Sequence, residues 1–367
     1  MRVQVVDPSA FTRPYDHALC TALALAGARV ELVTSRFAFG QAPAPDGYVL
    51  RDHFYRHANG AAASRRRLAL KLMEHVPDML RYRRLAKEAE VVHFQWLPVQ
   101  PIDVHLLPRR PLVLTAHDLL PREPRPGQLR AQRRLYERVD AVVVHSQHGR
   151  SSLVNELGVD ERKVSVIPHG AFEYLLRADR APLPGPLPAS GAPVVLFFGL
   201  LRPYKGLEVL LAAWREVRDA ELWIVGRPRM AIDELVRGAP SSVRFVPRFV
   251  TDGELATLFD RADVVVLPYT ATDRFDQSGV LATALAFGNP LVLSDVGGFG
   301  ELTQTGSALV VPPGDTERLR DAMQRLIDEP SLRTRLSKAA REAAAGPYSW
   351  DRAASRTIEL YRRLIEA

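Results

Sequence analysis

The sequence contains a single cysteine, Cys20, and no apolar run that approaches the 18 or so residues of a membrane-spanning helix. A lone cysteine excludes an internal disulfide and a zinc site built on cysteines, and it is typical of proteins kept in a reducing compartment. No signal-peptide pattern precedes the first apolar run, which begins directly after Arg2. These absences predict a cytoplasmic protein without a disulfide framework.

Lysine is also scarce, because only five of the 49 basic residues are lysine. The 42 acidic residues leave a formal net charge of +7. This excess is unevenly placed: residues 1–177 hold 26 basic and 18 acidic residues, whereas residues 178–367 hold 23 and 24. A basic first half indicates an anionic partner, which composition alone leaves open between nucleic acid, an anionic membrane surface and a phosphorylated ligand.

At 367 residues the chain is long enough for two domains. Short runs rich in Val, Ile and Leu alternate with amphipathic patterns, which predicts parallel sheets covered by helices on both faces. The predicted strands are 2–6, 29–33, 91–94, 112–115, 141–145, 164–167, 194–198, 221–225, 243–246, 264–267, 291–294 and 308–311. The predicted helical segments include 15–26, 64–90, 128–138, 315–345 and 349–366.

The segment 178–193 is rich in Pro, Ala and Gly and has no period, so it predicts a linker. We therefore expect two tandem doubly wound α/β domains at 1–177 and 194–346, followed by a terminal segment at 347–367. In open α/β sheets, ligands bind at the carboxyl ends of the strands. The functional site is thus expected in a cleft that the two domains face.

The most specific stretch is FFGLLRPYKG at 197–206. A buried strand ends at Gly199, where the missing side chain lets a ligand approach the backbone. Arg202 and Lys205 follow in a loop. Arginine grips phosphate oxygens in a fork and lysine acts as a point charge, so the pair suits a diphosphate. On these residues alone, a solvated turn with two surface cations remains open.

A second stretch, 264–301, runs from a strand through a polar loop into a helix that opens at Ser278-Gly279-Val280. Amides at a helix start meet an anion with the positive end of the helix dipole. A Gly297-Gly298 turn follows the next strand. A cationic loop, a helix start and a Gly-Gly turn in one domain favour an anion site over a plain βαβ turn.

Together these residues resemble the retaining glycosyltransferases of family 4, which have the GT-B fold. The resembling segments are TAHD (115–118), DAVVVHS (140–146), VSVIPHG (164–170), GLLRPYKG (199–206), ADVVVLPY (262–269), SGVLATALAFGNPLVLSDVGG (278–298) and YSWDRAASRTIELYRRL (348–364). The resemblance covers the whole chain in order. It implies two Rossmann-like domains facing a central cleft, with the last helix crossing back to the first domain.

The resemblance implies that the second domain binds a nucleoside-diphosphate sugar. Arg202 and Lys205 would neutralise the diphosphate, helped by the amides of Ser278–Val280. The other residues that the resemblance places around the donor are Gly199, Gly226, Arg248, Asp276, Gln277, Ser278, Gly279, Val280 and Thr283. No metal and no other cofactor is implied, because protein cations and a helix terminus would stabilise the leaving phosphate.

The resemblance also implies that the first domain binds the acceptor, which would be a glycan, a lipid-linked molecule or a small molecule. His117, at a strand end, matches the family histidine beside the reacting sugar, and Asp118 follows it. The first loop, 7–18, lacks the glycines that many relatives carry. Its Arg13, Tyr15 and Asp16 would line the acceptor side.

One departure concerns two glutamates that the family usually carries eight positions apart. Phe275 and Thr283 stand at these positions here. Losing a charge-assisted hydrogen bond to the ribose would weaken nucleotide binding by about 1.5–3 kcal/mol unless another group replaced it. Asp273 or Asp276 could serve the donor sugar, and Gln277-Ser278-Gly279 resembles a variant of a subset of these enzymes. The nucleobase and the sugar are therefore left open.

The implied activity is the transfer of a hexose-like sugar to an acceptor hydroxyl with retention of anomeric configuration. Two alternatives stay open: another enzyme on the same fold, such as a sugar-nucleotide epimerase or a phosphorylase, and a non-catalytic nucleotide-binding relative. The other histidines show no metal-ligand spacing, so no metal site is expected, and His169 is expected to be structural.

The basic excess concentrates in 51–84, with nine basic and three acidic residues, and in 109–150, with nine and four. In the first stretch apolar residues interleave with arginines, as in an amphipathic helix lying on anionic lipid. These residues are Leu68, Leu72, Met79 and Leu80. A solvated helix packing its apolar residues into its own domain is the alternative; the lipid interpretation predicts a protein peripheral on the inner face of the membrane. RNA-binding modules need aromatic platforms beside the charge, so no nucleic acid partner is expected.

Overall fold

The computed structural model describes residues 1–37, 43–58, 64–121, 124–187, 191–271 and 276–367. By its contacts the chain forms two compact units. The first comprises Met1–Pro168, a short segment that ends at Asp276, and Trp350–Ala367. The second comprises His169–Asp273 and Gln277–Ser349.

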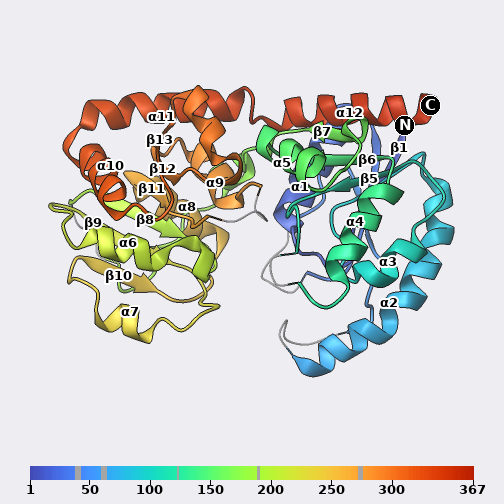
Figure 1. Cartoon of the computed structure of the whole chain (residues 1–367), viewed down its shortest axis with the longest axis horizontal. Coiled ribbons are helices and arrows are strands. Elements are labelled where there is room, and N and C mark those ends of the chain that lie inside the picture. Colours follow the sequence, from blue (N-terminus) through green and yellow to red (C-terminus); the bar gives the residue numbers. More distant parts are fainter. Residues whose placement is uncertain (38–42, 59–63, 122–123, 188–190, 272–275) are drawn as a thin grey trace. The chain divides into compact units, whose positions relative to one another are not determined.

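The first unit is built on a seven-stranded parallel sheet in the order β3-β2-β1-β4-β5-β6-β7 (Figure 1). Its strands are β1 (Arg2–Asp7), β2 (Arg29–Thr34), β3 (Val49–Asp52), β4 (Val91–Phe94), β5 (Leu112–Thr115), β6 (Ala141–Val144) and β7 (Val164–Val166). Its α-helices are α1 (Arg13–Leu25), α2 (Arg65–Leu85), α3 (Gln100–Leu106), α4 (Gln128–Arg138), α5 (Gln147–Ser151) and α12 (Trp350–Glu366).

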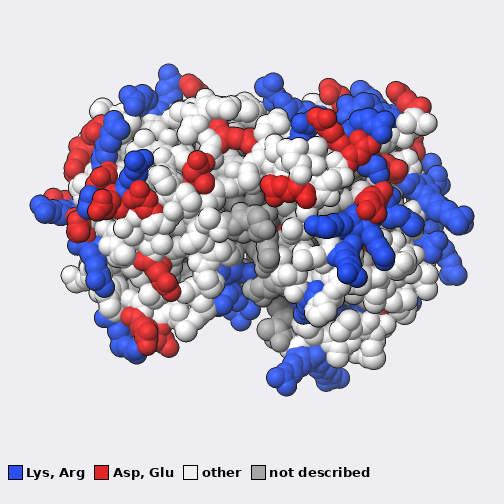
Figure 2. All heavy atoms as spheres, in the orientation of Figure 1, with Lys and Arg blue, Asp and Glu red and all other residues white. Residues whose placement is uncertain are grey.

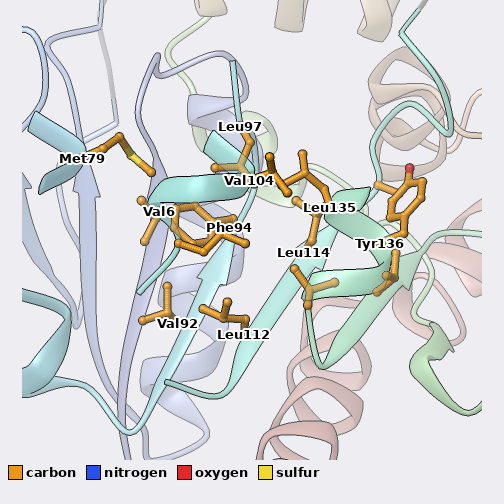
Figure 3. Packing of buried hydrophobic residues seen from close by; sticks show 14 of the residues in the cluster. Val6, Met79, Val92, Phe94, Leu97, Val104, Leu112, Leu114, Leu135 and Tyr136 are labelled. Atoms are coloured by element: carbon orange, nitrogen blue, oxygen red, sulfur yellow. The ribbon is translucent and has the colours of Figure 1, made fainter. Parts of the chain in front are cut away.

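Helices cover both faces of this sheet because successive strand residues point to opposite sides. Figure 3 shows one face, where side chains of β1, β4 and β5 meet those of α2, α3 and α4. Met79 of α2 is fully buried in this core, so its predicted place among lipid-facing residues is wrong. On the other face, His93 of β4 shares hydrogen bonds with Tyr361 of α12 (2.6 Å) and Thr115 (2.7 Å).

The second unit holds a six-stranded parallel sheet in the order β10-β9-β8-β11-β12-β13. Its strands are β8 (Val194–Phe198), β9 (Glu221–Val225), β10 (Val243–Val246), β11 (Val264–Leu267), β12 (Leu291–Ser294) and β13 (Ala308–Val311). Its α-helices are α6 (Leu207–Trp214), α7 (Asp233–Arg237), α8 (Asp252–Arg261), α9 (Gly279–Phe287), α10 (Thr316–Asp328) and α11 (Pro330–Ala345). Three 3₁₀ segments are η4 (Glu173–Arg177), η5 (Pro203–Lys205) and η6 (Gly297–Thr305).

The predicted fold class is confirmed: both units are parallel α/β layers, and every predicted strand is present within two residues of its bounds. The sequence prediction missed β3 and α3. All four residues of β3 are exposed or only half-buried, and Val49 is 61% exposed, so this edge strand has no apolar run to reveal it. Among the described residues, no helix combines the length and the apolar character needed to cross a membrane.

The unit boundary differs from the predicted one at residue 177, because the contacts assign residues from His169 onward to the second unit. The start of the predicted linker is also packed against α8. Thr257 Oγ donates to the carbonyl of Ala181 at 2.6 Å, and Arg180 forms an ion pair with Asp260 at 2.6 Å. Residues 178–187 are thus part of the second unit, although their sequence resembles a free connection.

Candidate functional site

In the second unit, the carboxyl end of β8 opens onto a lysine and the start of α9. Gly199 has φ +110°, and a Cβ atom added to it would lie 2.7 Å from Lys205 Nζ and 3.2 Å from Val280 Cγ2. Any side chain larger than hydrogen would displace one of these groups. The structure therefore brings Gly199, Lys205 and Val280 into one place, as the sequence predicts.

Lys205 is held in this place by a tight loop. Lys205 is buried, with 6% of its surface exposed, and its Nζ is 5.3 Å from the centre of the Tyr269 ring. Gly206, the next residue, has φ +70°, and a Cβ there would lie 1.8 Å from the carbonyl oxygen of Pro268. Arg202 precedes the same turn and is half-buried. The loop thus presents one fixed cation and one more accessible cation.

Side chains at the start of α9 form hydrogen bonds that fix its first turn. Ser278 is the N-cap, and its Oγ accepts a hydrogen bond from the amide of Val280 at 3.3 Å. Tyr269 Oη lies 3.2 Å from the same Oγ, while Gln277 Oε1 accepts from the amide of Ser278 at 3.1 Å. The amide of Gly279, the first helical residue, faces the same helix terminus, where the dipole favours an anion.

The remaining predicted donor residues fall into different environments. Gly226 lies directly beside Gly199, since a Cβ on Gly226 would be 1.8 Å from the carbonyl oxygen of Gly199. Thr283 is buried, and its Oγ donates to the carbonyl of Gly279 within α9 at 2.9 Å. Arg248 forms an ion pair with Glu254 of α8 at 2.6 Å and is half exposed. Only Gly226 of these three adjoins the cluster around Gly199.

Asp276 needs a correction, because the structure places it in the first unit rather than beside the donor cations. Its carboxylate is fully buried and accepts hydrogen bonds from the amide of His145 at 2.6 Å and from Ser146 Oγ. It therefore satisfies the start of α5 and is unavailable to a sugar. Asp273 and Phe275, the other residues weighed for the missing glutamates, lie outside the described residues.

In the first unit, His117 follows β5 and lines a cavity of about 200 Å³ together with Asp118. Its ring stacks on Trp96 with centroids 5.1 Å apart and an interplanar angle of 16°. His117 Nε2 shares a 3.1 Å hydrogen bond with Gln95 Oε1, and the Tyr15 ring packs edge-on at 4.7 Å. The predicted residues His117, Asp118 and Tyr15 are therefore close together, with His117 contacted by Trp96, Gln95 and Tyr15.

Sequence reasoning missed Gln95 and Trp96, which follow β4 as polar and aromatic residues at a strand end. The same rule that singled out His117 at the end of β5 would have found them. Trp96 Nε1 donates to Thr12 Oγ at 3.0 Å, and Thr12 Oγ in turn donates to Asp16 at 3.3 Å. The aromatic wall of the cavity is thus fixed to the first loop.

Arg13 and Asp16 need a second correction, because both are buried within the first unit rather than lining an acceptor surface. Burial raises the pKa of Asp16 well above its ordinary value, and the neighbouring carboxyl of Asp7 raises it further. Burial likewise lowers the pKa of His145, which packs beside His117, to about 4. Arg13, Asp16 and His145 are thus buried residues that do not line the cavity beside His117.

His169 is buried, packs edge-on against Phe172, and shares a 2.8 Å hydrogen bond from Nδ1 to the carbonyl of Gly170. These contacts fit the expected structural role. Within the described ranges, no three His, Cys, Asp or Glu side chains come together as metal ligands.

Comparison with known families identifies both halves of the chain. The profile of glycosyltransferase family 4 matches residues 15–171, and that of glycosyl transferases group 1 matches residues 192–329. A D-inositol 3-phosphate glycosyltransferase of Kineococcus radiotolerans is 29% identical over 274 residues, covering 65% of this chain and 61% of that protein. The chain spans about three fifths of the length of the curated relatives that it matches.

Solved structures share the fold over the entire chain. Sucrose-phosphate synthase of Thermosynechococcus elongatus superposes with a TM-score of 0.77 at 22% identity, covering 100% of this chain and 99% of that one. The Anabaena protein HepE, solved in complex with UDP-glucose, gives a TM-score of 0.74 at 18% identity, covering 99% and 100%. At these identities the likeness establishes the fold and leaves the chemistry to be argued from the residues.

Proposed function

Because the chain belongs to glycosyltransferase family 4 and has the GT-B fold, we propose that it transfers a sugar from a nucleoside-diphosphate sugar to an acceptor hydroxyl with retention. The observation that carries this proposal is the cluster of Gly199, Lys205 and the start of α9. It combines a buried cation, an open backbone and a helix N-terminus at one strand end. Such an arrangement suits a diphosphate.

The donor half of the reaction depends on charge neutralisation. Lys205 would contact the leaving phosphate as a point charge, and Arg202 would grip its oxygens from the accessible side of the loop. The amides at Gly279 and Val280 would add the helix dipole. The complex of HepE with UDP-glucose supports a donor of this chemical class.

The acceptor half would lie in the cavity beside His117. As the bond between the sugar carbon and the phosphate oxygen breaks, the acceptor oxygen forms the new bond on the same face. The acceptor proton passes to the leaving phosphate. His117, fixed by Trp96 and Gln95, would orient the reacting sugar. Catalysis would then rest on positioning and on stabilisation of the phosphate charge.

Binding and product analysis test this proposal. A thermal-shift series over nucleoside diphosphates should show about 2.7 kcal/mol of stabilisation at 100 times the dissociation constant. Lys205→Met should abolish this shift, whereas Lys338→Met, which changes an exposed lysine of the same unit, should leave it unchanged. NMR of the product should show retention, and an inverted linkage would contradict the mechanism.

Product analysis and nucleotide binding together separate the alternative functions. Turnover of a sugar nucleotide in the absence of any acceptor would indicate an epimerase. Release of a sugar phosphate from a glycan and inorganic phosphate would indicate a phosphorylase. Nucleotide binding without any turnover would indicate a non-catalytic relative.

We further propose that the outer face of α2 contacts an anionic membrane surface. Leu68, Leu72 and Met73 are 50%, 58% and 67% exposed beside Arg65 and Arg66. Figure 2 shows Lys and Arg side chains gathered over α4 and at the lower end of α2. Flotation with phosphatidylglycerol vesicles at low salt should recover the protein, and phosphatidylcholine vesicles should not. Equal recovery with both lipids, or with neither, would remove this interpretation.

A further inference from the structure

A second cavity in the first unit lies at the carboxyl ends of β2 and β3, apart from the cavity beside His117. It encloses about 440 Å³, within the size range of small-molecule sites. Its wall includes four basic side chains and one acidic side chain, which are Arg36, Arg56, Arg67, Lys71 and Asp52. Neither the donor cluster around Gly199 nor the cavity beside His117 includes any of these residues.

Arg67 shows that this charge is built into the fold. It is 7% exposed, and its Nε donates to the carbonyl of Ala58 at 3.0 Å. Neither Arg67 nor Lys71 forms an ion pair with any Asp or Glu of the described residues. The undescribed segments next in sequence to the cavity, 38–42 and 59–63, contain no acidic residue. A buried guanidinium without a carboxylate is costly, and an anionic ligand would offset that cost.

Lys71 lies one helical turn after Arg67 and faces the same cavity. Its Nζ is 4.7 Å from the centre of the Tyr55 ring. Burial, and then the nearby Arg67 charge, lower the pKa of Lys71 to about 8, while Asp7 raises it. Two cations thus converge on one volume. Arg66 and Leu72, their sequence neighbours, are exposed to solvent.

Ser35 places a hydroxyl without a hydrogen-bond partner in the wall of the same cavity. It lines the cavity, is 4% exposed, and its Oγ has no hydrogen-bond partner in the part of the chain that the structure describes. Buried hydroxyl groups are normally paired, and an unpaired one calls for an explanation. The Oγ atom itself is shielded from solvent, so a ligand oxygen would become its partner once the side chains that cover it move aside.

Tyr55 fixes the wall against which Lys71 lies. Its φ of +53° is a strained backbone conformation for a non-glycine residue. The strain is held by two contacts: the Tyr55 amide donates to Asp78 at 2.7 Å, and its hydroxyl shares a 2.7 Å hydrogen bond with His75. His75 in turn contacts Asp103 at 2.6 Å. A rigid, overdetermined wall of this kind is a feature of preorganised binding sites.

We propose that this cavity binds a phosphate monoester on the acceptor, with Arg67, Lys71 and Ser35 as its ligands. The inference rests on the proposed glycosyl transfer, since it names the chemical class of the molecule that receives the sugar. A guanidinium fork, an ammonium group and a hydroxyl match a tetrahedral oxyanion with several acceptor oxygens. This cavity lies at the ends of β2 and β3, and the one beside His117 lies at the ends of β4 and β5, so only β1 stands between them along the carboxyl edge of one sheet.

Calorimetry on the full chain with inorganic phosphate, glucose 6-phosphate and glucose tests the proposal. Both phosphates should bind and glucose should not. Lys71→Met, Arg67→Gln and Ser35→Ala should each weaken phosphate binding, the first two by about tenfold or more, as expected for a lost charge-assisted hydrogen bond. Lys87→Met is the matched control for Lys71→Met, because it removes an exposed lysine directly after α2 and should leave phosphate binding unchanged. Ser35→Ala keeps the test valid if Arg67→Gln fails to fold.

The outcomes separate this proposal from the proposed function. Unchanged phosphate affinity in Lys71→Met and Ser35→Ala, or equal binding of succinate, would overturn the phosphate site. Nucleotide binding that persists in these variants would then leave the transfer reaction standing. Binding to phosphatidic acid vesicles that is lost in Lys71→Met, without binding of the soluble phosphates, would assign the phosphate to a lipid headgroup. Binding of the soluble phosphates would assign it to a free acceptor.

Discussion

The contact between Gly199 and Lys205 leads to a sharp prediction for Gly199→Ala. The new Cβ would lie 2.7 Å from Lys205 Nζ and 3.2 Å from Val280 Cγ2, whereas ordinary contacts begin near 3.4 Å. The ammonium group must therefore move by about 0.7 Å or more, away from the backbone that a diphosphate would approach. In addition, alanine at φ +110° carries a backbone cost of about 1–2 kcal/mol.

The backbone cost and the displacement of Lys205 are measured by different assays, the first by thermal unfolding and the second by nucleotide binding. The backbone cost should lower the melting temperature of the second unit by about 2–8 °C. Displacement of Lys205 should remove most of a charge-assisted hydrogen bond of about 1.5–3 kcal/mol, which weakens nucleoside-diphosphate binding by about 10- to 150-fold. The affinity loss should therefore exceed what the loss of stability alone produces.

Gly314→Ala provides the matched control for this experiment. Gly314 has φ +79° and no heavy atom within 4 Å of an added Cβ, so it carries the backbone cost without the displacement. Differential scanning calorimetry and nucleotide titration of both variants separate the two effects. The reasoning is refuted if Gly199→Ala binds nucleotide as tightly as Gly314→Ala, or if both lose affinity equally.

Three further predictions concern Asp276, Lys71 and the proposed independence of a metal ion. Asp276→Asn should lower the free energy of unfolding of the first unit by about 1–3 kcal/mol in denaturant, because the side-chain amide cannot accept hydrogen bonds from both His145 and Ser146. Nucleotide affinity should stay unchanged. A tenfold loss of that affinity would instead show that Asp276 contributes to donor binding. Phosphate binding should peak between about pH 6, where phosphate gains its second charge, and about pH 8, where Lys71 loses its proton, since burial and the nearby Arg67 lower the pKa of Lys71 and Asp7 raises it. Lys71→Met should flatten the upper limb of this pH profile, and an unchanged upper limb would contradict the assignment. Initial-rate assays after EDTA treatment should retain full activity, since the leaving phosphate is proposed to be neutralised by Lys205 and Arg202, and a loss restored by Mg²⁺ would show otherwise.

The two-sided burial of the strands explains why the fold could be predicted. Runs such as VVLFF at 194–198 are apolar along their whole length, because each strand is covered on both faces. The exposed edge strand β3 lacked this signal. On α2, the pattern of apolar residues between arginines did not distinguish buried from exposed side chains: Met79 is in the core, whereas Leu72 and Met73 are exposed.

The sequence by itself determined the α/β architecture and the order of residues around Gly199, since a strand, a glycine and two cations follow one another within the twelve residues 194–205. Only the tertiary structure decided the fate of individual charges. Arg66 and Arg67 are neighbours in the chain, yet Arg66 is exposed to solvent and Arg67 is buried in the wall of a cavity, because a helix rotates successive residues by about 100°. Asp276 lies next to the donor motif in sequence and packs against the first unit instead. Local pattern sets the elements, and long-range packing selects which of their polar groups are left to meet a ligand.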